Sequence, residues 1–204
     1  MGKVILIGPL TKDVIRFGKT TLNSVGGSIY YAGEAFHKFG DSVTIVPFLS
    51  LENKHLLRHF SNKINVKPVY VETTFNFENI YPSHNVFNRR QRILTTHSFG
   101  KGITIKQLSN INFGDADLIF LGPQSHIDIP AEVIDYINNY NKNICLYTQG
   151  FFRSFTKDKI EEKKWDDDYK YLKNVKFLII SEGKLNGLTK KKIISEARSE
   201  LVKM

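Results

Sequence analysis

Short runs of continuous hydrophobicity, separated by segments with helical spacing, recur along this 204-residue chain. Such runs predict strands that are buried on both faces, and strands that alternate with helices form parallel sheets. The expected strands lie at residues 3–8, 42–48, 66–72, 117–122, 143–148 and 175–181, and the expected helices at residues 28–39, 51–60, 129–140 and 189–204. The sequence therefore predicts an α/β fold, a three-layer sandwich with a mainly parallel central sheet.

Residues 70–97 interrupt this alternation. The stretches TTFNFENIY and QRILTT within it predict exposed β-hairpins, and the stretch around GKT at residues 18–20 predicts a further small hairpin. No internal repeat and no Pro/Gly/Ser-rich linker divides the chain. We therefore expect a single domain over residues 1–204, with a β-flap or lid inserted at about residues 70–97.

The composition limits the classes of protein to which this chain can belong. The formal net charge is +9, with 41% hydrophobic and 24% charged residues, fractions typical of a globular protein. No apolar run approaches the ~18 residues that a membrane span needs, so no membrane partner is expected. Cys145 is the one cysteine and lies in an apolar run, which favours a buried, inert thiol and a cytoplasmic protein. The lysines are scattered among acidic residues, so a nucleic-acid partner is disfavoured.

Two adjacent glycines, Gly26 and Gly27, directly precede the helical pattern of residues 28–39. The sequence leaves two interpretations open. One is a tight turn that needs a positive φ. The other is a bare backbone that a ligand approaches closely beside a helix N-terminus. The phosphate-binding pattern G-x-x-x-x-G-K-[ST] is absent. Ser28 is the predicted N-cap of the helix, and Gly40 is its predicted C-terminal stop.

Polar residues follow several of the expected strands. Asp13 comes after the first strand, and residues 122–124 and 149–153 follow two later ones. Because ligands bind outside the carboxyl ends of parallel strands, we expect a site at this edge of the sheet. Among the last group, Arg153 either meets a phosphate or lies exposed on the surface.

Three other groups of residues are expected to have structural roles and no function in binding or catalysis. His55 and His59 are four residues apart on an expected helix, but no third ligand is evident, so a solvated face is favoured over a metal site. Phe151, Phe152 and Phe155 are expected in the core rather than along a pocket. The acidic run WDDDY at residues 165–169 is expected at the surface.

Several motifs occur in an order that resembles the ribokinase-like (PfkB) carbohydrate kinases. They are GPLTKD after the first strand, GGSIYYAGEAFHKFG, the TTFNFENIY insertion, ADLIFLGPQSHIDIP and TQGFFR, within residues 1 to about 184. The resemblance implies that Asp13 holds substrate hydroxyls, that Gly26 and Gly27 lie against the sugar, and that the flap closes over it. It also implies transfer of the ATP γ-phosphate to a sugar or nucleoside hydroxyl with Mg²⁺. The expected substrate-side residues are Asp13, Gly26, Gly27, Tyr31, Phe75, Asn79 and Gln124.

The sequence also departs from that family. The C-terminal Gly-Ala-Gly-Asp segment, which would supply the base and the anion hole, is not found, so we expect the catalytic and nucleotide-binding segment to be absent from this chain and assign no catalytic residue. The family's N-x-x-E element would fall at Ser181 to Lys184, which read SEGK. Three hypotheses stay open: an incomplete sugar kinase, a relative that binds a sugar or nucleoside without phosphorylating it, and a basic nucleic-acid-binding α/β protein. A homodimer through the flap or an exposed sheet edge is also expected.

Overall fold

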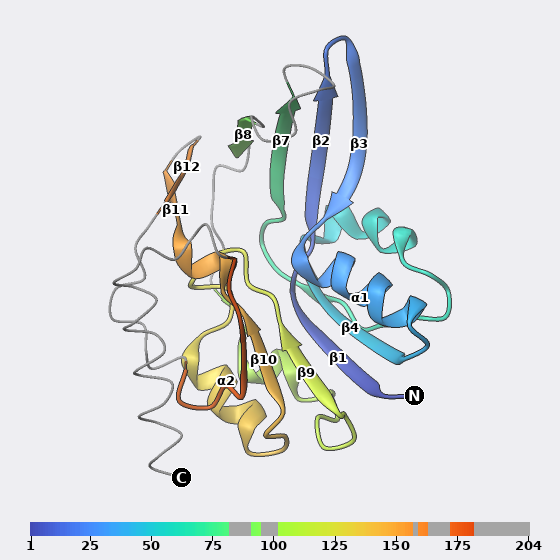
Figure 1. Ribbon diagram of the computed structural model, residues 1–204, viewed down its shortest axis with the longest axis vertical. Helices are drawn as coiled ribbons and strands as arrows, with labels where there is room; N and C mark the ends of the chain where they lie inside the picture. Colours follow the sequence, from blue (N-terminus) through green and yellow to red (C-terminus); the bar gives the residue numbers. More distant parts are fainter. Residues whose placement is uncertain (82–90, 95–101, 157–158, 163–171, 182–204) are drawn as a thin grey trace.

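A computed structural model describes residues 1–81, 91–94, 102–156, 159–162 and 172–181. Its largest element is a seven-stranded sheet with the order β13-β10-β9-β1-β4-β5, in which β6 also pairs with β4. Every pairing in this sheet is parallel. The strands are β1 (Lys3–Pro9), β4 (Ser42–Leu49), β5 (Asn65–Val66), β6 (Val69–Tyr70), β9 (Leu118–Leu121), β10 (Ile144–Tyr147) and β13 (Phe177–Ile179). Figure 1 shows their arrangement.

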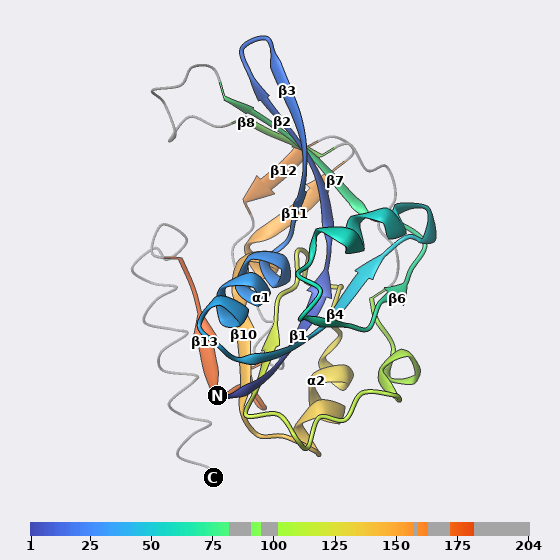
Figure 2. The same ribbon diagram turned by 90° about the vertical axis from the view of Figure 1, so that its right-hand side faces the viewer.

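Side chains of the parallel strands form a separate core on each face of the sheet. On β1, Val4 and Leu6 pack in one cluster with Ile29 of helix α1 (Ser28–Lys38). Ile5 and Ile7 alternate with them and pack in a second cluster, together with Val133, Ile134 and Ile137 of helix α2 (Ala131–Asn138). Figure 2 shows the two helices on opposite sides of the sheet. The predicted three-layer sandwich with a mainly parallel sheet is therefore confirmed.

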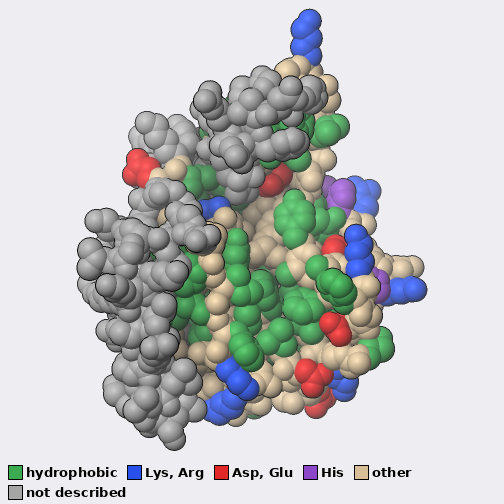
Figure 3. Space-filling view, viewed as in Figure 1, with side chains coloured by type: hydrophobic (Ala, Val, Ile, Leu, Met, Phe, Trp, Pro, Cys, Tyr) green, Lys and Arg blue, Asp and Glu red, His purple; other side chains and the backbone are tan. Residues whose placement is uncertain are grey.

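One edge of the sheet is less covered on the α1 side. Phe177 and Ile179 of β13 lie beside Cys145 and Tyr147 of β10 in the parallel register, and paired residues of neighbouring strands point to the same face. Phe177 is 47% and Ile179 is 44% exposed. Figure 3 shows hydrophobic side chains gathered at the surface over this part of the molecule.

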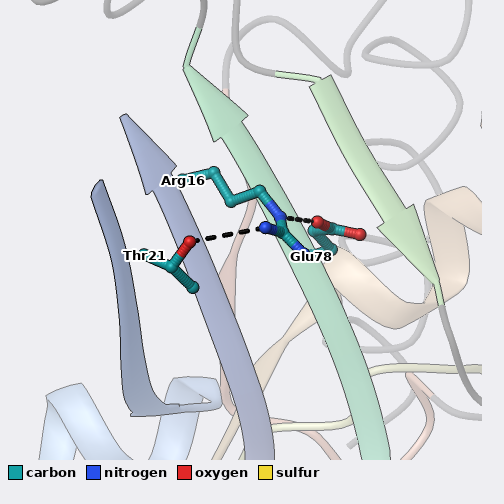
Figure 4. Close-up of polar contacts among 3 residues, drawn as sticks. All are labelled: Arg16, Thr21 and Glu78. Carbon is teal, nitrogen blue, oxygen red and sulfur yellow. Dashed lines mark hydrogen bonds and ion pairs between the residues drawn. The ribbon is translucent and has the colours of Figure 1, made fainter. Parts of the chain in front are cut away.

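A four-stranded sheet with the order β3-β2-β7-β8 forms the flap, which rises from the main sheet (Figure 1). Its strands are β2 (Thr11–Phe17), β3 (Thr20–Gly26), β7 (Phe75–Tyr81) and β8 (Gln91–Leu94). The insertion expected at residues 70–97 contributes β7 and β8. The other half comes from the hairpin around GKT, which turns at Gly18 with a φ of 54°. On the outer face Arg16 donates to Glu78 and to Thr21, so one side chain ties β2 to both neighbouring strands (Figure 4).

Helix α1 begins and ends at glycines. Its N-cap is Gly27, with a φ of 104°, so the prediction of Ser28 as N-cap is wrong. The Ser28 hydroxyl donates instead to the carbonyl oxygen of Gly122 over 2.9 Å. After the C-cap residue Phe39, Gly40 has a φ of 91° and its N–H donates to His37. The predicted glycine stop is confirmed, because a left-handed residue after the last turn favours glycine.

The remaining connections are short. Residues 51–60 were expected as an ordinary helix and form a 3-10 helix, η1 (Leu51–His59). The strand expected at 66–72 is split into β5 and β6 around Pro68, because proline has no N–H to donate to a ladder. Two further 3-10 helices, η3 (Ile105–Leu108) and η4 (Thr148–Phe152), and the hairpin of β11 (Arg153–Thr156) and β12 (Lys159–Glu162) complete the described elements. The helix predicted at 189–204 lies outside the described residues.

Within the described chain, no helix is long and apolar enough to cross a membrane.

Candidate functional site

Asp13 is a buried carboxylate at the base of the flap. It lies within β2, where only 7% of it is exposed. The Thr11 hydroxyl donates to its Oδ1 over 2.8 Å, and the Asn79 amide donates from β7 to its Oδ2 over 3.3 Å. Thr11 and Asn79 are themselves buried. Because hydrogen bonds from two sides fix the carboxylate, its orientation is set before any ligand arrives.

The bare backbone at Gly26 faces this carboxylate. A Cβ atom added to Gly26 would lie 2.6 Å from Thr11 Oγ1 and 2.7 Å from Asp13 Oδ2. Such distances are too short for non-bonded atoms, so any side chain at this position would displace the Asp13 carboxylate. The absence of a side chain at Gly26 therefore has a local cause: it gives the Asp13 side chain its space.

Gly27 has a different requirement. Its φ of 104° disfavours any residue with a side chain, and an added Cβ would lie 2.7 Å from the carbonyl oxygen of Pro9, the last residue of β1. The interpretation as a positive-φ turn is confirmed, and this turn places the start of α1 directly beside the end of β1. The approach of a ligand to the bare backbone stays a prediction. The three residues expected to form the site, Asp13, Gly26 and Gly27, are thus brought together.

The loop after β9 joins the same edge. A Cβ added to Gly122 would lie 2.3 Å from Ser28 Oγ, so this loop packs on the first residue of α1. Further along the loop, Gln124 is only 2% exposed, and its Oε1 accepts a hydrogen bond of 2.9 Å from the Arg153 guanidinium. Arg153 is 8% exposed, so the alternative of an exposed surface arginine is wrong.

Asp128 fixes the conformation of this loop. Its carboxylate accepts hydrogen bonds from the backbone N–H groups of Gln124 and Ser125, over 2.7 and 2.8 Å, and from the Ser125 hydroxyl over 2.6 Å. Burial raises the pKa of Asp128 to about 6, although these hydrogen bonds act in the opposite direction. The Gln124 side chain is therefore positioned by a buried acid four residues later.

Aromatic side chains form a wall between the flap and the β11–β12 hairpin. The Phe75 ring lies 6.1 Å from the Phe77 ring on β7 and 5.6 Å from the Phe155 ring on β11. Phe75 also lines a cavity of about 30 Å³, room for about one water molecule, together with Pro9 and Asp128. Asp128 belongs to the loop after β9, so this cavity lies between the flap, the end of β1 and that loop.

Tyr31 stands apart from these contacts. It lies in the first turn of α1 with 59% of its surface exposed, and its hydroxyl donates to the Val25 carbonyl oxygen over 3.4 Å. Its ring meets Tyr30 edge-on. In the described contacts it does not join Asp13, Asn79 or Gln124.

Sequence reasoning missed Thr11 and Asp128. Thr11 precedes Asp13 by two residues on the same strand, so the two-residue period of a strand would have placed both on one face. Asp128 gave no comparable signal, because its role depends on a loop that folds back on itself.

The other residues weighed in the sequence lie either in the core or on an exposed surface. Phe151 and Phe152 lie in the core, as predicted. The same prediction is wrong for Phe155, which is only partly buried and packs against Phe75 of the flap. Cys145 is buried, and burial raises the pKa of its thiol to about 11, so it remains protonated at neutral pH. His55 and His59 are both exposed on η1. Across the described residues, no three His, Cys, Asp or Glu side chains gather in a group that could hold a metal ion.

Solved structures identify the fold. A pyrophosphate-dependent kinase of the ribokinase family, in complex with sulfate, matches 97% of this chain and 70% of its own, with a TM-score of 0.76 and 20% identity. A structure of such a kinase with a pyrophosphate analog and myo-inositol matches with a TM-score of 0.77 and 18% identity, over 97% and 69% of the two chains. Ribokinase from Arabidopsis thaliana, complexed with ribose and ATP, matches with a TM-score of 0.59 and 10% identity, over 98% and 69%.

No protein-family model and no curated protein matches the sequence. At these identities the likeness shows the fold alone, and the chain has the fold of the ribokinase-family sugar kinases. The resemblance inferred from the motifs is confirmed at that level, and the chain spans about 70% of the length of these kinases.

Proposed function

We propose that this chain forms the sugar-binding part of a ribokinase-like carbohydrate kinase, which transfers a phosphoryl group to a hydroxyl of a sugar, cyclitol or nucleoside. One observation carries the proposal. A buried carboxylate, Asp13, lies at the base of a β-flap, fixed by Thr11 and Asn79 and given space by Gly26. This group sits beside the carboxyl ends of the parallel strands, where ligands of such sheets bind.

The geometry suits recognition of hydroxyl groups. The Thr11 hydroxyl and the Asn79 amide orient the Asp13 carboxylate, and carboxylate oxygens accept hydrogen bonds from hydroxyl groups. A ligand that lacks the hydroxyl would leave a desolvated carboxylate oxygen without that donor, which is a strong basis for rejection. The wall formed by Phe75 and Phe155 would limit the access of water to the bound ligand.

The solved structures support a polyhydroxylated ligand. One was solved with myo-inositol and another with ribose. Their phosphoryl donors differ, since one binds a pyrophosphate analog and the other ATP. ATP with Mg²⁺ therefore remains the prediction from the sequence, and pyrophosphate is the alternative donor to test.

The described residues do not form a complete binding site for a phosphoryl donor and its metal ion. No group of three candidate metal ligands is found among them, and no described residue matches the catalytic base of the family. Asp13, Thr11, Asn79 and the glycine pair therefore bind and orient the acceptor in this proposal, and we assign no proton transfer or phosphate contact to them.

A non-catalytic sugar- or nucleoside-binding protein is the second candidate. The observation that favours it is the SEGK sequence at Ser181 to Lys184, in place of the N-x-x-E element that the resemblance predicts. Ser181 is exposed, and residues 182–184 lie outside the described residues. Both candidates share the binding site, so they differ only in whether the bound ligand is phosphorylated.

Isothermal titration calorimetry with myo-inositol and D-ribose tests the shared proposal. The wild-type chain is expected to bind at least one of them. Asp13→Asn should weaken binding at least about tenfold, because an amide replaces one acceptor with a donor. Gly26→Ala should do the same by displacing the carboxylate, whereas Gly114→Ala, at a site with only one atom within 4 Å, should bind like wild type. Wild-type affinity in Asp13→Asn would contradict the proposal.

A coupled assay separates the two candidates. Wild-type chain at high concentration is incubated with the bound sugar, Mg²⁺ and either ATP or pyrophosphate, and sugar phosphate is measured by mass spectrometry. Product with either donor that disappears in Asp13→Asn supports the kinase. Binding without product from either donor supports the non-catalytic candidate.

A further inference from the structure

Basic side chains gather on one surface of the molecule, over η1 and the last turn of α1. Figure 3 shows Lys, Arg and His side chains close together at this margin. All of the following are exposed: Lys38, Lys54, His55, Arg58, His59 and Lys63. We call this surface the basic ridge. It contains no residue of the candidate functional site.

Packing against the sheet decides which residues of η1 face the solvent. Leu56 of η1 and Phe60, which follows it, are buried in the same cluster as Ile29 of α1. A 3-10 helix has about three residues per turn, so the residues between these apolar positions point away from the core. The ridge therefore lies on the side of the sheet that α1 covers.

Ser61 joins η1 and α1 into one surface. Its backbone N–H donates to Glu34 of α1 over 3.2 Å, and its hydroxyl lies 3.3 Å from His37 Nε2. Lys38 lies one turn after Glu34 on the same side of α1, and Lys63 follows Ser61 by two residues. The end of α1 and the turn after η1 thus add cations to those of η1.

The positive charge of the ridge is not neutralised by ion pairs. Within the described part of the chain, no Lys or Arg side chain of the ridge forms one. The two acids nearby are bonded to uncharged groups. Glu34 accepts from the Ser61 N–H, and Glu52 accepts from the Asn53 side-chain amide over 3.3 Å. An ordinary protein surface mixes charges of both signs, so this excess of one sign favours an anionic partner.

The spacing of the cations suits a partner with several negative charges. A 3-10 helix rises about 2 Å per residue, so Lys54 and Arg58 are about 8 Å apart along η1. This separation is within the Debye length of about 10 Å at 0.1 M salt, and their potentials therefore add. The Arg58 Nε donates to the His55 carbonyl oxygen over 3.1 Å, which keeps the guanidinium at the surface of η1.

We infer that the basic ridge binds the phosphate backbone of a nucleic acid without reading its sequence. Repeated phosphates meet several cations at once, and the release of counterions drives such binding. The order of charges along the chain disfavours this partner, but the fold gathers cations from three segments onto one surface. A membrane surface fits less well, because Leu51 is the one exposed apolar side chain of η1 and membrane-surface helices present a row of them. The inference goes beyond the proposed function and does not depend on it.

Fluorescence anisotropy with a fluorescein-labelled DNA duplex of mixed sequence, at salt concentrations from about 50 to 200 mM, tests the inference. Wild type should bind with an affinity that falls steeply as salt rises. Lys54→Gln combined with Arg58→Gln should bind at least about tenfold more weakly at about 100 mM salt. The slope of log K against log salt should become shallower by about 2, because each lost phosphate contact removes about 0.9.

The matched control removes the same charge elsewhere. Lys19→Gln combined with Lys142→Gln changes exposed lysines in the turn of the flap hairpin and in the turn after α2, and should bind DNA like wild type. Because all four side chains are exposed, chemical unfolding should show both double variants to be as stable as wild type. An equal loss of DNA affinity in both would show that the net charge, and not the ridge, attracts DNA, and would overturn the inference.

Two further outcomes would also overturn it. One is the absence of duplex binding by wild type at about 50 mM salt. The other is binding to phosphatidylserine vesicles but not to the duplex, with loss in Lys54→Gln/Arg58→Gln, which would assign the ridge to a membrane surface. Calorimetry with myo-inositol and D-ribose should give the same affinities in the ridge variant as in wild type. The two proposals can therefore fail separately.

Discussion

Asp13 and Asp128 are both buried acids near the carboxyl edge of the sheet, and they differ in the groups that donate hydrogen bonds to them. Asp13 accepts hydrogen bonds from Thr11 and Asn79, which are side chains of the flap. Asp128 receives three from the loop that holds Gln124. The first carboxylate is oriented toward the flap, where a ligand is expected, and the second holds a loop in place. In the proposed function Asp13 is therefore the residue for ligand recognition, and Asp128 is a positioning residue.

Asp128 makes the stability of the fold depend on pH. Burial raises its pKa from 3.8 to about 6, so the folded chain binds this proton more tightly than the unfolded chain does. The resulting stability is fully present below about pH 4 and is lost as the pH rises through about 6. Because Asp128→Asn is neutral at every pH, the free energy of unfolding of wild type relative to this variant should fall by about 2–3 kcal/mol between pH 4 and pH 7.

Urea unfolding of both proteins at intervals of pH measures this difference. A rise of the wild-type value relative to Asp128→Asn over the same interval would show that the three hydrogen bonds to the carboxylate outweigh its burial.

At the scale of elements, the flap and the β11–β12 hairpin come from distant parts of the sequence and meet through aromatic rings. Phe75 begins β7, and Phe155 lies on β11, with their ring centroids 5.6 Å apart. Phe155 is two residues from Arg153, so both side chains lie on the same side of β11. The Arg153 guanidinium donates a hydrogen bond to Gln124. The contact therefore links the flap to the loop after β9.

Phe155→Ala should loosen this link. Loss of a half-buried aromatic contact is expected to destabilise the chain by about 1–2 kcal/mol. Hydrogen exchange of backbone amides should increase in β7 and β11 but not in the central strands β1 and β9. Phe39→Ala, at a side chain that is 87% exposed, is the control and should change neither the stability nor the exchange. Unchanged exchange in β7 would show that the flap does not depend on the hairpin.

The elements also show what the sequence could predict. The main strands were found because a strand that is buried on both faces is continuously apolar, as in β1, β9 and β10. Half of the flap was not assigned to it, since β2 pairs with β7 across about sixty residues and no local pattern encodes that partner. Likewise, the expected site residues Asp13, Gly26 and Gly27 lie together, but the support from Thr11 and Asp128 depends on tertiary contacts. Whether these residues bind a ligand stays a prediction.

At the scale of the whole molecule, the chain aligns with about 70% of the length of the kinases it resembles. Its sheet reaches β13 at one edge, where Phe177 and Ile179 leave nearly half of their surfaces exposed. Within the described residues, β13 pairs with β10 on one side only. An edge strand with exposed apolar side chains is a template for association with another chain.

We therefore expect the chain to self-associate through the β13 edge. Charged residues at an edge strand block such pairing, because they cannot be buried against a second apolar surface. The double variant Phe177→Glu with Ile179→Lys should shift the chain toward monomer in light scattering coupled to size-exclusion chromatography, over a concentration series. Phe39→Glu, which places a charge at an isolated exposed phenylalanine near the end of α1, should leave the distribution unchanged. A wild-type chain that stays monomeric at every concentration would contradict this expectation, and a dimer that persists in the double variant would direct attention to the edge strands of the flap, β3 and β8.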